Sequence, residues 1–238
     1  MTKHFFYSLI AGLLMISCNK PLHLSGIIKE EIRSVNADFN LIKSTGAYDV
    51  EIMEGAQDGK IKLTGDSNIL DKIIVEVNEK TLLIKQKPGF YTSHGDAVKI
   101  SLNAQNLKGL TLTGSGSIQS NGIQKTDELK IVLDGSGDIS TRVSSFKIEV
   151  QLNGSGDIKL SGQTDNLTAG VAGSGDIHAF ELKAKKVSAG LTGSGNLEVY
   201  ASESLSAGVT GSGEVLYKGE PKDKDFKVAG SGQIIKAN

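Results

Sequence analysis

Aliphatic and polar residues alternate through the second half of this chain in seven blocks, each with the same phase relative to the tripeptide Gly-Ser-Gly. The tripeptides begin at residues 114, 135, 154, 173, 193, 211 and 230, so the period stays close to 19 residues. A period this regular is typical of a solenoid, in which each repeat is one structural unit stacked on the last. The pattern therefore predicts an all-β protein, mostly a parallel β-helix or solenoid with coils of about 19 residues.

Three aliphatic columns keep a fixed distance from the tripeptide and predict the core. Four residues before its first glycine stand Leu110, Ile131, Val150, Ala169, Ala189, Ala207 and Phe226. Two residues before it stand Leu112, Leu133, Leu152, Val171, Leu191, Val209 and Val228. Four residues after it stand Ile118, Ile139, Ile158, Ile177, Leu197, Val215 and Ile234. Alternation with a period of two indicates strands, and the identical phase indicates that equivalent positions stack in successive coils.

The tripeptide is expected to form a bend between two strands. A residue without a Cβ tolerates positive φ and the close approach of the neighbouring coil, so these bends should require glycine. If most of the chain after the leader is coiled at this period, about eleven coils stack into a rod of about 50 Å, at the spacing of hydrogen-bonded strands.

The first half of the chain is less regular. Short alternating stretches predict strands at 39–43, 50–52, 60–66, 75–77 and 82–84. Asp66 or Ser67 is a suitable cap for a helical turn over 68–71, residues 78–81 join the last two strands, and 88–96 form an irregular loop. We divide the chain into a leader (1–17), a lipid-anchor linker (18–34), an N-terminal β part (35–110) and the regular repeats (111–238), which continue the preceding part.

The first 18 residues have the features of a lipoprotein leader. Lys3 precedes an apolar stretch, 5–16, that is too short to span a bilayer, and Met15-Ile16-Ser17-Cys18 resembles the lipobox of bacterial lipoproteins. Cleavage before Cys18 and acylation of this cysteine would hold the protein at a membrane, since several acyl chains anchor firmly where one binds marginally. The alternative is an ordinary signal peptide with an incidental cysteine.

The expected location is the cell envelope. Residues 19–23 lack the acidic cluster that sends some lipoproteins to the cell surface, so we expect an outer-membrane lipoprotein that faces the periplasm, with surface exposure as the alternative. Cys18 is the only cysteine, so no intramolecular disulfide is available. The 26 basic and 27 acidic side chains nearly balance, which gives no electrostatic basis for binding nucleic acid.

The stretch 39–84 resembles a known family. Its segments 46–52 (Gly-Ala-Tyr-Asp-Val-Glu-Ile), 64–66 (Thr-Gly-Asp) and 82–84 (Leu-Leu-Ile), with Gly55 and the downstream segment 107–116, are similar to the putative auto-transporter adhesin head GIN domain. The resemblance covers about residues 35–238, although Ala47-Tyr48-Asp49 stands where the domain has its eponymous Gly-Ile-Asn. It implies a β-helical solenoid in a lipoprotein or secreted protein, with adhesion as its function and no established catalytic residues.

A polar column directly follows the bends. Its members are Ser117, Asp138, Asp157, Asp176, Asn196, Glu214 and Gln233. The three successive aspartates would lie about 4.8 Å apart, and bound Ca²⁺ would relieve their repulsion. Alternatively, each side chain hydrogen-bonds backbone N–H groups at its own bend and stays solvated. No other cofactor is expected.

The same aspartate column is the basis of an enzyme hypothesis, because glycoside hydrolysis needs two carboxylates at a defined separation. The chain offers repeated carboxylates rather than a singular pair, it has no Trp, and only 5% of its residues are aromatic and able to stack on sugars. Gly-Ser-Gly recurs seven times, whereas a nucleophile elbow occurs once, as Gly-x-Ser-x-Gly. We therefore expect no catalysis.

Three successive coils carry small residues at positions of outward parity, which predicts a bare surface. These residues are Thr168, Gly170, Ala172, Ser188, Gly190, Thr192, Ser206, Gly208 and Thr210. Such a surface suits the docking of a partner or of another copy. Alternatively, the small residues only permit tight curvature of the coils.

The sequence thus predicts a lipid-anchored, non-catalytic binding or adhesion scaffold for a glycan or protein ligand. Two alternatives belong to other classes: a carbohydrate-active enzyme that uses the aspartate column, and a structural envelope protein that self-associates through the exposed strand edges of its last coil.

Overall fold

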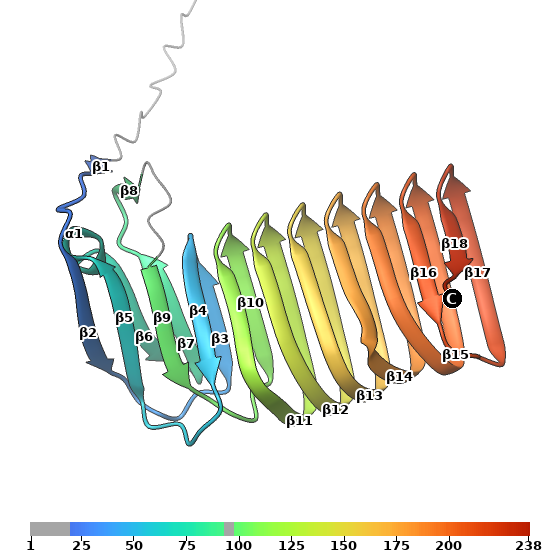
Figure 1. Cartoon of the computed structure of the whole chain (residues 1–238), viewed down its shortest axis with the longest axis horizontal. Coiled ribbons are helices and arrows are strands. Elements are labelled where there is room, and N and C mark those ends of the chain that lie inside the picture. The colour runs from blue at the N-terminus through green and yellow to red at the C-terminus, as the bar shows by residue number, and fades with distance from the viewer. Residues whose placement is uncertain (1–19, 93–97) are drawn as a thin grey trace, which may run out of the picture.

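The computed structural model describes residues 20–92 and 98–238, so Cys18 lies outside the described residues. The protein is nearly all β, with 74% strand and 2% helix. Its strands wind into an elongated stack of coils (Figure 1). The described residues contain no helix with the length and apolar character that crossing a membrane requires.

The elements follow one another in chain order. The less regular part contains β1 (Lys20–Leu22), β2 (Ile28–Ser34), β3 (Leu41–Thr45), β4 (Tyr48–Met53), β5 (Lys60–Asp66), α1 (Ser67–Leu70), β6 (Ile73–Asn78), β7 (Thr81–Gln86), β8 (Phe90–Thr92) and β9 (Val98–Asn103). The regular part contains β10 (Gly109–Gly114), β11 (Ser117–Gly135), β12 (Asp138–Gly154), β13 (Asp157–Gly173), β14 (Asp176–Gly193), β15 (Asn196–Gly211), β16 (Glu214–Lys218), β17 (Asp223–Gly230) and β18 (Gln233–Lys236).

The long strands β11 to β15 each run from one Gly-Ser-Gly bend to the next and pair in parallel. Gly135, Gly154 and Gly173 face one another in register, as do the aliphatic residues of each column. This arrangement confirms the predicted parallel solenoid with coils of about 19 residues. It has about seven turns, so the expectation of eleven coils was wrong. The first half of the chain pairs several of its strands antiparallel instead of coiling.

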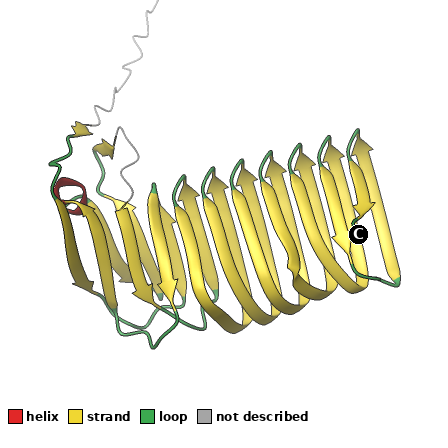
Figure 2. Ribbon diagram, viewed as in Figure 1, coloured by secondary structure: helices red, strands yellow, loops and turns green. Residues whose placement is uncertain are grey.

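The two strands expected in each coil are one continuous strand. β12, for example, leaves one bend and curves without interruption around the opposite edge before it enters the next bend (Figure 2). Coils of different length differ at that edge, opposite the bends. The pairing of β14 with β15 shifts register between Ala179 and Lys183, where the 20-residue coil holds residues that the 18-residue coil lacks.

The strands of the stack form one continuous 16-stranded sheet, and each coil contributes one segment to each of the two faces of the stack, which we call sheet I and sheet II. Sheet I contains the segments that run into the bends, and it continues through β10, β3 and β7 to β6 at one end and to β17 at the other. Sheet II contains the segments that leave the bends, and it continues through β4, β9 and β5 to β2 at one end and through β16 to β18 at the other.

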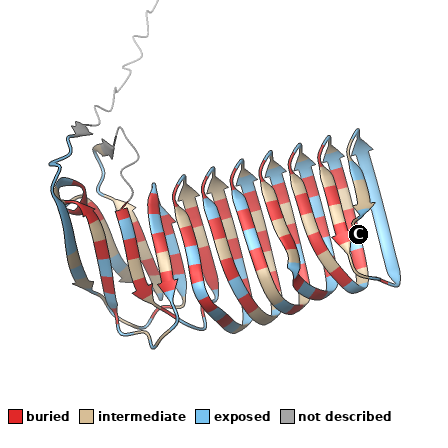
Figure 3. Cartoon of the chain, in the orientation of Figure 1, coloured by how far each residue is buried: buried red, intermediate tan, exposed pale blue. Residues whose placement is uncertain are grey.

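The three predicted columns form the core between the sheets. From Leu110 to Val215 their members are only 0–4% exposed, and buried residues alternate with exposed or half-buried ones along the long strands β11 to β15 (Figure 3). In β17, the outermost strand of sheet I, the equivalent residues Phe226 and Val228 are 39% and 49% exposed. Two further core columns escaped prediction. They contain Leu129, Ile148, Leu167, Val187 and Leu205, and Ser120, Thr141, Leu160, Ala179, Val199 and Tyr217.

The bends require glycine for the reasons expected. Gly173 has a φ of +136°, and a Cβ added to it would collide with the carbonyl oxygen of Gly154 in the preceding coil. A Cβ on Gly175 would collide with the carbonyl oxygen of Gly156 and lie 2.9 Å from Leu152 Cδ2. This close approach lets the N–H of Ser174 donate to the Gly154 carbonyl at 2.9 Å, so each bend is hydrogen-bonded to the one before it.

The N-terminal part closes one end of the core. Asp66 caps α1 by accepting a hydrogen bond from the Asn68 N–H at 2.9 Å, and β6 and β7 form a hairpin, both as predicted. β2 lies within the stretch 18–34 that we expected to be a linker. Since β2 pairs antiparallel with β5, residues 28–34 belong to sheet II. Part of the expected loop 88–96 is also a strand, β8, which pairs with β1.

Candidate functional site

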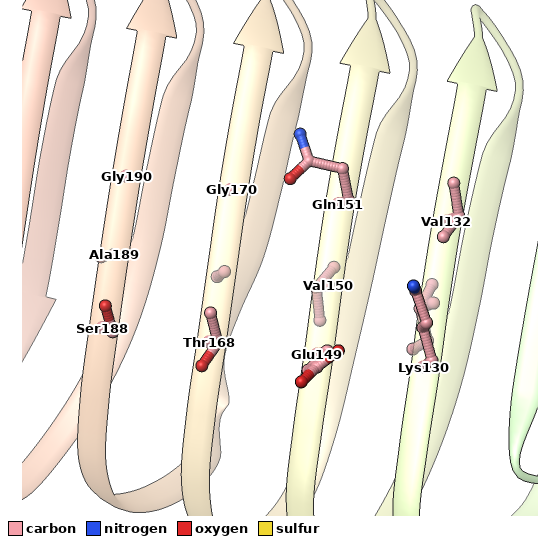
Figure 4. Close-up of a pocket in the computed structure, with 12 residues that line it drawn as sticks. Lys130, Val132, Glu149, Val150, Gln151, Thr168, Gly170, Ser188, Ala189 and Gly190 are labelled. Carbon is pink, nitrogen blue, oxygen red and sulfur yellow. The ribbon is translucent and has the colours of Figure 1, made fainter.

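The nine residues of the predicted bare surface lie together on the outer side of sheet I. They come from β13, β14 and β15, and all nine are exposed or half-buried. Gly190 pairs in register with Gly170 on one side and with Gly208 on the other, so three glycines form a line across three strands. Figure 4 shows Gly170 and Gly190 on adjacent strands.

The backbone does not require these three glycines. A Cβ added to Gly190 would meet nothing within 4 Å, and one added to Gly208 would lie 4.0 Å from the Lys227 carbonyl oxygen. At Gly170 the nearest atom is Oε1 of Gln151, at 2.6 Å, which is the flexible end of a side chain. None of the three has φ in the left-handed region. They therefore differ from the bend glycines, where contact with the preceding coil excludes a Cβ and the first glycine of each bend also has positive φ.

Long side chains on the neighbouring strands turn one side of the bare surface into a groove. Lys130 on β11 and Glu149 and Gln151 on β12 stand out from sheet I, whereas the equivalent positions on β13 and β14 hold Thr168, Gly170, Ser188 and Gly190 (Figure 4). The resulting depression has a volume of about 570 Å³. It is open to solvent, and the short residues of β13 and β14, among them Thr168 and Ser188, form its floor.

One wall of the groove is fixed by an ion pair. Glu149 Oε1 lies 2.6 Å from Lys147 Nζ. The hydrogen bond and the charge of Glu149 raise the pKa of Lys147, and those of Lys147 lower the pKa of Glu149. Both groups are therefore charged at neutral pH. Gln151 Nε2 donates to Asn153 Oδ1 at 2.9 Å, which fixes the side chain that overhangs Gly170.

A second depression of about 490 Å³ adjoins the first, and both are lined by Lys130 and Glu149. Its other lining residues include Phe146, whose side chain is 61% exposed. Sequence reasoning missed this aromatic ring and the charged wall. The available signal was the change of residue type between coils, since Glu149 and Gln151 occupy the same repeat positions as Thr168 and Gly170.

The aspartate column lies along the bends, apart from the groove. Asp138, Asp157 and Asp176 pair in register on successive coils, and the first two are exposed. Asp176 Oδ1 accepts hydrogen bonds from the backbone N–H of Asn196 at 2.6 Å and from its side-chain amide at 3.0 Å. Asp176 thus hydrogen-bonds the bend of the following coil, whereas we had expected each side chain of the column to bond N–H groups at its own bend.

A small cluster of ligand-type atoms forms at the end of this column. Potential ligand atoms of Asp157, Asp176 and His178 lie within 4.8 Å of one another, and His178 Nδ1 is 3.1 Å from Glu198 Oε2. Ca²⁺ takes six to eight oxygen ligands. An imidazole nitrogen and an aspartate already engaged with Asn196 supply few of them. The donor set therefore suits a hydrogen-bonded turn better than it suits calcium.

The groove does not have the composition of a glycosidase site. Glu149 is the only carboxylate among the residues that line the larger depression, and it is ion-paired with Lys147. Glycoside hydrolysis uses two carboxyl groups on opposite sides of the scissile bond, one of them protonated.

Known structures share this architecture. A putative adhesin from Bacteroides fragilis is 27% identical over 92% of this chain and 100% of its own, with a TM-score of 0.83. A putative lipid binding protein from Parabacteroides distasonis is 28% identical over the same shares of the two chains, with a TM-score of 0.78. A putative adhesin from Parabacteroides merdae shares the fold at 24% identity, with a TM-score of 0.72. None of the curated proteins matches.

The family model extends beyond the repeats. It matches residues 38–221, from the first predicted strand to the loop before β17. The match therefore includes both the less regular part and the strands that carry the bare surface. This chain belongs to the family described as putative auto-transporter adhesin, head GIN domain.

Proposed function

We propose that this protein is a lipid-anchored, non-catalytic binding scaffold of the cell envelope, and that its ligand lies across the bare surface of sheet I. The adhesin family and the adhesin-like neighbour from B. fragilis support a binding role at the envelope. The lipobox-like residues that end at Cys18 support the anchor.

The observation that carries the binding site is the line of glycines at 170, 190 and 208. Glycine inside a strand costs about 0.5–1 kcal/mol relative to alanine. At Gly190 neither the φ angle nor contact with a neighbouring atom requires a glycine, so nothing in the backbone explains this cost. A glycine of this kind is typical of a place where a ligand or another backbone approaches closely.

The chemistry of the groove favours a polar, extended ligand. Hydroxyl groups of Thr168 and Ser188 lie on its floor, and Lys130, Glu149 and Gln151 supply charged and amide groups at its wall. A glycan or an extended polypeptide fits this arrangement. A lipid, suggested by the neighbour from P. distasonis, would have to lie on the surface, because aliphatic columns fill the space between the sheets.

Glycan and protein arrays test this function. The wild-type chain, Thr192→Arg on the bare surface and Gln119→Arg on sheet II are compared on the same arrays and in thermal melts. We expect the wild type and Gln119→Arg to bind the same spots without turnover, and Thr192→Arg to lose them while melting normally. Equal binding by all three proteins would place the ligand elsewhere. Release of reducing sugar would indicate an enzyme, and concentration-dependent filaments a self-associating structural protein.

The anchor and its membrane face need separate measurements. Intact mass of the membrane-derived protein should show acyl groups on Cys18, and an unmodified mass would contradict the anchor. Protease treatment of intact cells then distinguishes the two faces. Digestion would show surface display, and protection would show the periplasmic location expected from residues 19–23.

A further inference from the structure

A second exposed feature lies at the N-terminal end of the molecule, far along the stack from the groove. Four large apolar side chains within nine residues are exposed there: Leu24 at 49%, Ile27 at 58%, Ile28 at 69% and Ile32 at 63%. We call these four residues the N-terminal apolar patch. Clustered apolar exposure of this kind indicates an interaction surface, whereas single exposed apolar residues are ordinary.

The orientation of β2 is the reverse of what a water-facing edge strand needs. Ile28 and Ile32 point outward from sheet II, and the opposite parity carries Glu31 and Arg33. The Arg33 guanidinium reaches across the end of the core and donates to the carbonyl oxygens of Ile73, at 2.5 Å, and Leu70, at 2.7 Å. If the register of β2 against β5 shifted by one residue, Ile28 and Ile32 would turn toward the core, but the hydrogen bonds of Arg33 would be lost. The register of β2 therefore keeps the apolar side chains outside.

The segment that leads into the patch is held in place. Asp66 Oδ2 accepts hydrogen bonds from the Ser25 hydroxyl at 2.9 Å and from the Gly26 N–H at 2.8 Å, and the N–H of Ser67 donates to the Ile27 carbonyl at 2.9 Å. The patch is thus presented by an ordered backbone next to α1. Between the two isoleucines of β2, Glu30 forms an ion pair with Lys62 at 2.7 Å, so the charges there compensate each other.

We propose that the N-terminal apolar patch inserts into the lipid surface to which the chain is anchored, so that the solenoid stands with its N-terminal end in the membrane interface. This inference rests on the proposed acylation of Cys18. Leu24 follows Cys18 by six residues, which span at most about 20 Å even when fully extended. A lipid surface is therefore always within reach of the patch, and the tether raises its effective concentration there.

The lipid surface explains features of the patch that a second copy does not. The patch is confined to the end nearest the anchor, and its ion-paired charges suit zwitterionic headgroups at the depth of an interfacial segment. In this orientation the stack of coils extends away from the membrane (Figure 1), and the groove is carried on strands remote from β2. The membrane end and the ligand surface are then separate.

Tryptophan fluorescence tests the proposal directly, because the chain contains no Trp. The full chain is produced with its own leader, recovered from membranes and reconstituted into vesicles of phosphatidylethanolamine and phosphatidylglycerol, with or without brominated acyl chains. Ile28→Trp reports on the patch. Phe146→Trp, at an apolar position near the groove that is 61% exposed, against 69% for Ile28, is the matched control. Thermal melts of both variants verify folding.

We expect the emission of Ile28→Trp to shift to the blue and to be quenched roughly twofold by bromine, since an interfacial apolar segment lies at the boundary of the acyl region. Phe146→Trp should remain unquenched. An unquenched Ile28→Trp would overturn the proposal, and so would equal quenching of both variants, which would mean that the solenoid lies flat. A blue shift that depends on protein concentration but not on bromine would assign the patch to a second copy. Intact mass reports separately on the anchor, so loss of acylation and loss of insertion are distinguishable.

Discussion

Glycine occupies two different environments in the regular coils. At the bends, as at Gly173, it combines a φ of +136° with backbone contact that excludes a Cβ. On sheet I, as at Gly190, it has neither constraint. The first environment belongs to the fold and the second to the surface, and substitution by alanine separates them.

Gly173→Ala and Gly190→Ala should change stability in opposite directions. Alanine at 173 must adopt a left-handed conformation, which costs about 1–2 kcal/mol, and its Cβ also forces two bends apart. Alanine at 190 should stabilise the strand by about 0.5–1 kcal/mol. Thermal or denaturant unfolding measures both. Equal effects would mean that the two glycines are not distinct.

A buried hydroxyl offers a second test at this scale. Thr141 is 3% exposed, and its Oγ1 has no hydrogen-bond partner among the described residues. Thr141→Val keeps the shape of the side chain and removes an unsatisfied polar group, so we expect stabilisation of about 1 kcal/mol. Denaturant unfolding is the measurement, with Thr168→Val on the exposed surface as control. Destabilisation of Thr141→Val would indicate that the hydroxyl has a partner.

At the scale of the elements, the value of a core position depends on whether both neighbouring coils cover it. Leu152 in β12 is fully buried between coils, whereas its equivalent Val228 in β17 is 49% exposed. Leu152→Ala should cost about 2–5 kcal/mol, in the range of core truncations. Val228→Ala should cost less than half as much. Comparable losses in unfolding experiments would mean that β17 is covered in solution.

The cap of α1 makes one element sensitive to pH. Burial opposes ionisation of Asp66, but hydrogen bonds from Ser25, Asn68 and Gly26 outweigh it and hold the pKa of this carboxyl below its ordinary value. The ionised group therefore stabilises the fold above its unfolded pKa of roughly 4, and this contribution is lost as the pH falls through the lower folded pKa. Asp66→Asn should melt lower than the wild type at neutral pH, with the difference shrinking below about pH 4. A pH-independent difference would argue against the cap.

Columns with an aliphatic residue in every copy were predictable from sequence, and interrupted columns were not: the column of Leu129 was missed because Lys108 and Lys224 stand at its position in the first and last copies. The columns of Leu112 and Ile118 were visible because every copy keeps an aliphatic residue. The column of Thr141 and Leu160 was missed because its members range from Ser to Tyr, and burial there is set by stacking rather than by residue type. The nine small residues of the bare surface were found from their parity. The wall of the groove was not found, because Glu149 forms a wall only when it lies next to strands with short residues such as Gly170 and Gly190.

At the scale of the whole molecule, the two ends differ from the middle. The regular coils in the middle repeat the same sequence pattern and the same pairing with the next coil, so the period of the sequence is sufficient to predict their structure. The N-terminal end is built by pairings such as that of β2 with β5, which is antiparallel, joins residues from Ser34 and Lys60 to Ile28 and Asp66, and follows no period. That end also carries the N-terminal apolar patch, so the part of the fold that was hardest to predict is the part assigned to the membrane. The ligand surface lies on the regular coils, where the scaffold is most uniform.

The central claim is that sheet I keeps Gly190 bare for a ligand, and the variant Gly190→Arg tests it most directly. Binding to the ligand found on the arrays and thermal melting are measured on the same samples, with Gln119→Arg as control. We predict a melting temperature no lower than that of the wild type, because a Cβ at 190 meets nothing within 4 Å, together with a loss of binding of at least tenfold, about 1.4 kcal/mol. A folded Gly190→Arg that binds as the wild type does, or a variant that fails to fold because the coils need glycine there, would contradict the claim.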